Sequence, residues 1–259
     1  MKSGRFATSL AAALLAGLLT FSGATQASAA EVVPITPEVI AQADSEALAH
    51  PLTDREMTEI ADQLSEEAST ESGLSQDELE SLDAELENGE LTAWVNGKQL
   101  DPGSVQASAP GGIRSISAMS TTAAYVPTTW GACGAFDAST KNVRTFYLNS
   151  VPYAYRAIYL KCGTTGWGYR HIKDAHMNDW ANKAIYVGAN WRDMADFAIT
   201  DALQHVYSGV YNPTNQTYKY RGVVELRRFD GRTVHTFYPV VAVSAGDYRI
   251  ITAYPSNVR

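Results

Sequence analysis

The chain has 259 residues, of which 45% are hydrophobic and 19% are charged. This composition is typical of a globular protein with a sizeable core, and it excludes a disulfide-stapled miniprotein and a wholly disordered chain. The formal net charge of −8 is unevenly distributed, because residues 31–120 carry 19 acidic side chains against 3 Lys or Arg, whereas residues 121–259 carry 9 against 15. An acidic segment therefore precedes a basic one.

Residues 1–29 have the three parts of a secretory signal peptide. Lys2 and Arg5 give a positive start, an apolar run follows from Leu10 to Phe21, and the small residues 27–29 suit signal peptidase. The apolar run is shorter than the about 20 residues that a membrane-spanning helix needs. We therefore expect a secreted, extracellular protein that is not associated with a membrane.

The acidic segment, residues 30–105, is expected to be mainly helical. Capping boxes open two of its helices, one formed by Thr53 with Glu56 and the other by Ser75 with Glu78. Apolar residues at helical spacing predict helices over residues 37–49, 53–69 and 75–88.

Two roles are open for the acidic segment. One is a solvated helical spacer, since runs of charge are usually solvated faces. The other is an intramolecular propeptide that covers the basic part, because opposite charges on two tethered units favour their association. A hairpin turning at Asn96-Gly97 follows the helices, and residues 106–124, rich in Ala, Ser, Thr and Gly, form the expected linker.

Residues 125–259 are expected to fold as a basic α+β domain. Asn190 caps a predicted amphipathic helix over about residues 191–207. Strand-like stretches precede and follow this helix, and Asp230-Gly231 predicts a hairpin between the last long strands. The sequence therefore predicts helices followed by an antiparallel sheet that is covered by helix on one face.

Cys133 and Cys162 are the only cysteines of the chain. An exported protein meets an oxidising compartment, in which a pair of cysteines is usually joined. We therefore expect a Cys133–Cys162 disulfide. Neither cysteine lies in a cysteine-protease signature, which argues against a catalytic thiol.

The histidines of the basic domain are the main candidates for chemistry. His171 and His176 are five residues apart, which on an ideal helix puts them about 140° apart. A two-ligand metal site on a helix needs the i, i+4 spacing, so we expect neither a metal nor another cofactor here. His205 lies at the edge of the apolar stripe of its helix, and we interpret it as a surface residue.

His235 belongs to the hairpin that turns at Asp230-Gly231. With those two residues as the loop, Leu226 pairs with His235, and Arg228 pairs with Thr233. Because residues two apart on a strand share a face, His235 and Arg228 are expected to be diagonal neighbours.

Imidazoles and guanidinium groups on a basic domain suit metal-independent cleavage of RNA. The 2′-OH needs a base, the leaving oxygen needs an acid, and histidine serves both roles near neutral pH. Arginine binds phosphate through two hydrogen bonds. Arg170 and Lys173, beside the histidines, are therefore expected to bind the substrate, and Tyr169 is expected to stack on a base.

The stretches GYRHIKDAH (168–176) and IITAYP (250–255) resemble motifs of the barnase/EndoU/RelE-like (BECR-fold) ribonucleases, above all their bacterial toxin branch. The resemblance covers about residues 140–259 and implies helices before a four-stranded antiparallel sheet. It also implies an RNA substrate, products with 2′,3′-cyclic phosphate ends, and an immunity protein as partner. The implied catalytic residues are His171, His176, Arg227, Arg228, His235, Thr252 and Tyr254.

A different class of function also fits this composition. A non-enzymatic secreted module could use the same basic face to bind anionic polymers. A peptidase is disfavoured, because the chain contains neither GxSxG nor HExxH. Clustering of the histidines with Tyr254 would favour the enzyme over the binding module.

Overall fold

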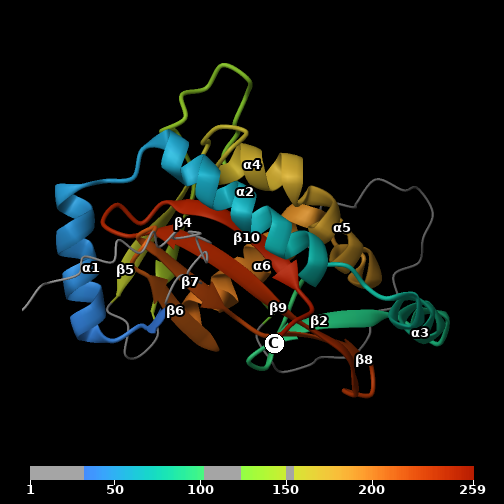
Figure 1. The fold of residues 1–259 in the computed structure, drawn as a ribbon. Coiled ribbons are helices and arrows are strands. Elements are labelled where there is room, and N and C mark those ends of the chain that lie inside the picture. The colour runs from blue at the N-terminus through green and yellow to red at the C-terminus, as the bar shows by residue number, and fades with distance from the viewer. Residues whose placement is uncertain (1–31, 102–123, 150–154) are drawn as a thin grey trace, which may run out of the picture.

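The computed structural model describes residues 32–101, 124–149 and 155–259. Two expected segments lie outside the described residues. They are the signal peptide at residues 1–29 and the linker at residues 106–124, of which only residue 124 is described. The described parts form a mixed α+β structure, as expected. Helices lie on both sides of a large antiparallel sheet (Figure 1), whereas helix was expected on one face only, because α2 (Asp54–Glu71) of the acidic segment packs on the second face.

The main sheet is larger than the four strands that the sequence analysis expected. It has eight strands in the order β1-β6-β7-β9-β8-β2-β3, with β10 paired to β9, and the pairings are antiparallel. The strands are β1 (Val33–Pro34), β2 (Leu91–Val95), β3 (Lys98–Gln99), β6 (Ser208–Asn212), β7 (Thr217–Arg221), β8 (Val224–Arg228), β9 (Thr233–Ser244) and β10 (Ile250–Ser256).

Two features explain why the expected sheet was too small. The β6–β7 hairpin follows the helix directly and was not recognised in the sequence. Strands β1, β2 and β3 come from the acidic segment, where β1 pairs with β6 and β2 pairs with β8. Residues of the acidic segment and of the basic domain therefore share one sheet and one hydrophobic core.

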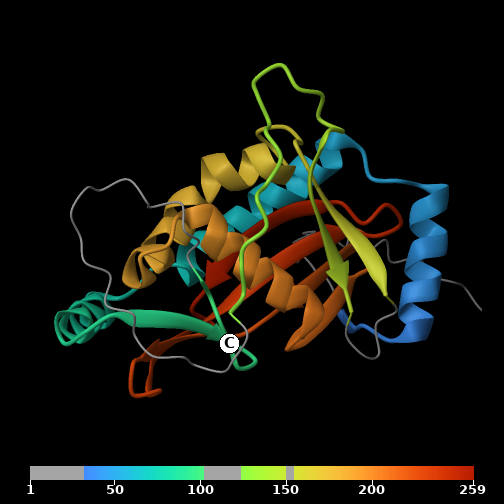
Figure 2. The same cartoon turned by 180° about the vertical axis from the view of Figure 1, so that it is seen from behind.

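The two faces of the sheet carry different helices. Helix α6 (Trp191–Gln204) covers one face (Figure 2), and α2 (Asp54–Glu71) crosses the other face over β10 (Figure 1). The remaining helices surround these layers: α1 (Pro37–Ala49), α3 (Gln76–Glu87), α4 (Gly168–Ala175), α5 (Met177–Ala184) and the short 3₁₀ helix Ile185–Val187.

The helix starts follow the capping residues of the sequence. Thr53 and Ser75 each accept a hydrogen bond from the backbone N–H three residues later, and both capping boxes are complete. Asn190 caps α6 as expected. Helix α6 ends at Gln204 rather than near residue 207, because His205 leaves the helical conformation and acts as its C-cap.

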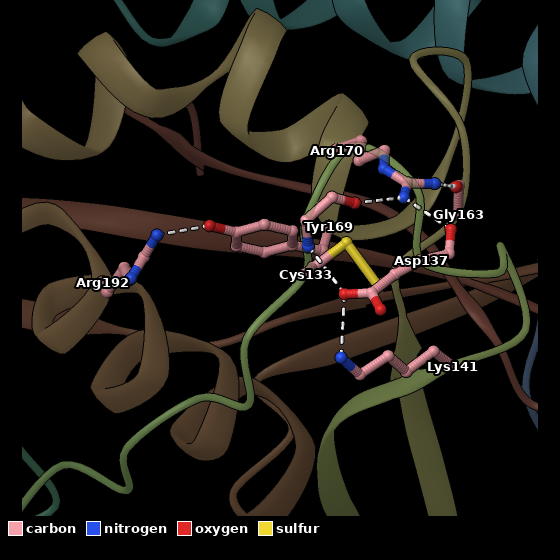
Figure 3. Close-up of a disulfide and its surroundings, with 9 residues drawn as sticks. Cys133, Asp137, Lys141, Gly163, Tyr169, Arg170 and Arg192 are labelled. Atoms are coloured by element: carbon pink, nitrogen blue, oxygen red, sulfur yellow. Dashed lines mark hydrogen bonds and ion pairs between the residues drawn. A yellow bond between two sulfur atoms is a disulfide. The ribbon is translucent and has the colours of Figure 1, made fainter.

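A disulfide anchors the irregular chain that leads into the second, smaller sheet. Cys133 is joined to Cys162, which confirms the expected pair (Figure 3). Cys162 follows directly after β5 (Arg156–Lys161), which pairs with β4 (Asn142–Leu148). Within the described ranges, no helix has the length and apolar character to cross a membrane.

Candidate functional site

His171 and His176, here called the histidine pair, lie side by side at a break between two helices. Helix α4 ends at Ala175, and His176 stands between it and α5. This break removes the angular separation that a continuous helix would impose. The two imidazole rings lie 5.4 Å apart between centroids, and both side chains are buried.

Backbone packing fixes the start of α4 and so the position of the histidine pair. Gly163 has a positive φ of 63°, and a Cβ there would lie 1.9 Å from the Trp167 carbonyl oxygen. Only glycine permits this close approach of the chain to itself. The tight turn ahead of α4 therefore depends on the glycines of the CGTTGWG stretch.

Both imidazoles direct the same nitrogen to one hydroxyl group. The Nε2 atoms of His171 and His176 lie 3.2 and 3.3 Å from Oγ of Ser65, a residue of α2. Nδ1 of His171 lies 3.0 Å from the carbonyl oxygen of Thr165, and Nδ1 of His176 lies 3.1 Å from the Asp179 carboxylate. Carbonyl and carboxylate oxygens only accept, so each Nδ1 carries a proton.

The hydrogen bonds around Ser65 are two protons short if both imidazoles are neutral. Each Nε2 is then an acceptor, and the Ala61 carbonyl oxygen, 2.8 Å from Ser65 Oγ, is a third acceptor. One hydroxyl proton cannot serve three acceptors. A protonated imidazole would supply one further proton, because its Nε2–H can donate to Ser65 Oγ. The two imidazoles therefore converge on one shared oxygen, where each can accept or donate a proton.

The surroundings of the two imidazoles differ. Burial lowers the pKa of His171, and the neighbouring His176 adds to this effect. Nδ1 of His176 lies against the Asp179 carboxylate instead, and this contact orients its ring. Burial therefore favours the neutral form of His171.

Tyr254 and Thr252 belong to the same region. The Tyr254 ring lies 5.4 Å from that of His176 between centroids, and both β10 side chains are fully buried. Burial, together with the nearby Glu67 and Glu71 carboxylates, raises the pKa of Tyr254. The structure therefore brings together four of the seven expected catalytic residues: His171, His176, Thr252 and Tyr254.

Two basic residues that the sequence analysis did not select share this face of the sheet. Along the strand pairings, Arg221 lies in one row with Val240 and Tyr254, and Lys219 lies in the next row with Ala242 and Thr252. Paired residues on neighbouring strands share a face. Lys219 and Arg221 therefore extend the region from the histidine pair across β9 to β7.

Helix α2 covers the whole region. Its apolar side packs on the sheet and on the turn before α4, through contacts with Trp167, Val240, Ala242, Ile251 and Tyr254. Its acidic residues meet the basic ones, since Glu67 binds Lys219 at 2.7 Å, and Glu71 lies 3.4 Å from Arg221. The acidic segment thus lies directly over the expected catalytic histidines.

His235 is not part of this cluster. It shares a face with Leu226 and Phe237, which pack in the core on the α6 side of the sheet. Its Nε2 lies 3.5 Å from Nζ of Lys183, a buried residue of α5. Burial lowers the pKa of Lys183 to about 8, and burial together with Lys183 lowers the pKa of His235 to about 4.

The two arginines of β8 lie apart from the histidine pair as well. The expected pairing of Leu226 with His235 is confirmed, but a bulge follows, so Arg227 rather than Arg228 pairs with Thr233. This corrects the expected register at the end of the hairpin. Arg228 binds Glu85 of α3 at 3.1 Å.

Arg227 instead lines a separate cavity of about 490 Å³ next to the C-terminal end of α6. His205 also lines it, and its Nδ1 lies 2.9 Å from the carboxylate of Asp201. Burial raises the pKa of Asp201. His205 is 40% exposed at its side chain, as its interpretation as a surface residue requires. Its pairing with a buried carboxylate was not expected.

The three expected substrate-binding residues are spread around α4. Arg170 donates hydrogen bonds to the carbonyl oxygens of Gly134, Asp137 and Gly163, so its guanidinium group ties the disulfide-bonded loop to α4 (Figure 3). The buried Tyr169 accepts a hydrogen bond from Arg192. Lys173 is exposed on α4.

Comparison with known proteins identifies similar mycobacterial chains. The chain is 34% identical over 142 residues to an uncharacterized protein of Mycobacterium tuberculosis, in strain CDC 1551 / Oshkosh and in strain H37Rv. The match covers 51% of this chain, and the chain spans about half the length of these curated relatives. No family model and no solved structure matches.

Ser65, the shared partner of the two histidines, could not be predicted from the sequence because it comes from a distant element. Ser65 is more than 100 residues from either histidine, and nothing in its helical surroundings indicates a contact with an imidazole. Asp179 could have been found, since it follows His176 by three residues, about one helical turn. Lys219 lies on a strand that was not predicted.

Proposed function

We propose that the chain is a metal-independent endoribonuclease whose histidine pair carries out the proton transfers. The observation that carries this proposal is the meeting of two Nε2 atoms at one hydroxyl oxygen, with each Nδ1 anchored by an acceptor. A proton acceptor and a proton donor placed on either side of reacting oxygens are what cleavage through the 2′-OH requires. The likeness to BECR-fold ribonucleases supports the same reaction.

In this proposal His171 is the base and His176 is the acid. His171 takes the proton of the ribose 2′-OH, and the resulting oxygen attacks the phosphorus. The bond from phosphorus to the 5′-oxygen breaks, and His176 gives its proton to that oxygen. The products are a 2′,3′-cyclic phosphate and a free 5′-OH. Asp179 accepts the Nδ1–H hydrogen bond of His176 and so keeps its Nε2 directed at the reacting oxygens.

Secretion is part of the proposal. The expected signal peptide directs export, and the Cys133–Cys162 disulfide is compatible with an extracellular location. Binding of anionic polymers without cleavage is the alternative. It is disfavoured in the full chain, because Lys219, Arg221 and Arg228 are already paired with carboxylates.

The test is RNA cleavage in excess chelator by a full-length variant whose α2 is loosened. Glu67→Lys/Glu71→Lys places two cations against Lys219 and Arg221, so it opposes docking of α2. In this background, His171→Gln and His176→Gln should each lower the cleavage rate about 10²–10⁴-fold.

His205→Gln is the matched control, because His205 lies at the separate cavity, and it should leave the rate unchanged. Products should carry 2′,3′-cyclic phosphate ends. If both variants of the histidine pair cleave RNA as fast as their background does, the cleavage does not come from this site. Retention of RNA without cleavage would favour the binding module.

A further inference from the structure

Helix α2, here called the lid, makes polar contacts that go beyond those of a simple cover. Ser65 Oγ lies within hydrogen-bond distance of Nε2 of both imidazoles of the histidine pair. Within two helical turns of Ser65, the Glu67 carboxylate forms an ion pair with Lys219, and the Glu71 carboxylate forms one with Arg221. The lid thus presents one hydroxyl and two anionic groups to one continuous strip of the sheet.

The chemistry of these groups matches that of an RNA strand. Resting on the ribonuclease function proposed above, we propose that the lid imitates the substrate. Ser65 takes the place of a reacting ribose oxygen, and Glu67 and Glu71 take the place of backbone phosphates. Lys219 and Arg221 are then the phosphate-binding subsite that RNA occupies once the lid has left.

The sheet register gives the position of this subsite. Arg221 and Tyr254 lie in one row, separated by β9, so their backbones are about two strand spacings, or about 10 Å, apart. The Arg221 side chain bridges much of that separation, since its Nη1 lies 3.4 Å from Oγ of Ser256, two residues beyond Tyr254 in β10. The subsite therefore adjoins the expected catalytic residues of β10, and we expect it to contribute to phosphate binding rather than to proton transfer.

The ion pairs of the lid are partly buried, which distinguishes Glu67 and Glu71 from the other acidic residues of the helix. The side chains of Lys219 and Arg221 are 23% and 15% exposed, and those of Glu67 and Glu71 are 32% and 15% exposed. Elsewhere on the same helix, Glu59 and Glu66 face the solvent. Substitution of Glu59 and Glu66, which do not face the basic residues of the sheet, is therefore a control for substitution of Glu67 and Glu71, which do.

The first experiment compares full-length proteins. Glu67→Lys/Glu71→Lys should speed amide hydrogen exchange of residues 54–71 at least tenfold and raise RNA cleavage by a similar factor. Glu59→Lys/Glu66→Lys has the same net charge and should change neither quantity. If the first variant exchanges faster and still cleaves no RNA, the proposed ribonuclease function is wrong, and α2 is only a structural cover of the sheet. If wild type and both variants cleave RNA at the same rate, the ribonuclease function is supported, and the proposal that the lid blocks the RNA site is wrong.

The second experiment tests the subsite within the opened variant. Lys219→Gln should raise KM about tenfold and leave kcat unchanged, since it removes one charge-assisted phosphate contact. It should also reduce the slope of log binding against log salt concentration by about 1. Lys141→Gln, at an exposed lysine paired with Asp137, is the control and should alter neither. A loss confined to kcat, or no effect of Lys219→Gln, overturns the phosphate subsite.

Discussion

The Lys183–His235 contact places two basic side chains against each other in a buried position. Lys183 is fully buried, its Nζ donates to the Asn257 side chain at 2.6 Å, and it lies over the Phe237 ring. Two cations at this distance repel each other, and burial penalises the charge on both. His235 is therefore neutral in the folded protein at neutral pH.

This neutral imidazole makes stability depend on pH. The pKa of His235 is about 4 in the folded protein and about 6.5 when it is unfolded, so below pH 6.5 the unfolded state binds more protons. We expect the Tm to fall as the pH is lowered from about 6.5 to 4. His235→Gln should flatten this decline, as measured by thermal unfolding at several pH values.

His50→Gln is the control for that measurement, because His50 is exposed and lies at the end of α1, on another element. An equal decline in wild type and in His235→Gln would mean that His171 or the carboxylates carry the pH dependence instead.

At the scale of elements, the stability of α2 depends on the hydrogen bonds that cap its first turn. The Thr53 side chain and the Glu56 carboxylate exchange hydrogen bonds with each other's backbone N–H. Loss of an N-cap costs about 1 kcal/mol. Thr53→Ala should therefore speed hydrogen exchange of α2 about fivefold, which hydrogen-exchange mass spectrometry can measure. Ser75→Ala, which removes the matching cap of α3, should leave α2 unaffected; equal effects of the two variants on α2 would contradict this expectation.

The same elements show how far local sequence determines the structure. The three acidic helices, the Asn190 cap and the Asn96-Gly97 turn rest on interactions within four residues, and they could be predicted. The pairings of β1 with β6 and of β2 with β8 join residues more than 130 positions apart, so no local pattern specifies them. The site follows the same rule: His171 and His176 could be selected, but Ser65 and Lys219 could not.

For the whole molecule, the disulfide is the covalent link between otherwise separate segments. It closes a loop with a sequence separation of 29, which constrains the unfolded chain and stabilises the folded one by about 3–4 kcal/mol. Cys133→Ser/Cys162→Ser should lower the free energy of unfolding by this amount, measured with denaturant. A loss below about 1 kcal/mol would mean that Arg170 and its three carbonyl contacts hold the loop without the disulfide.

The chain order of the sheet has a consequence for how the protein is made. Strand β10, which completes the face under α2, is synthesised after the other described strands of the sheet, whereas α2 precedes most of them. Strands β1 and β2 flank α1–α3 in the chain and are themselves part of the sheet, so α2 is tethered at both ends before β10 exists. Pairings of such long range form slowly, after much of the chain is present. The histidine pair therefore becomes ordered in a chain that already carries α2, and access of RNA to the pair would require α2 to leave the folded sheet.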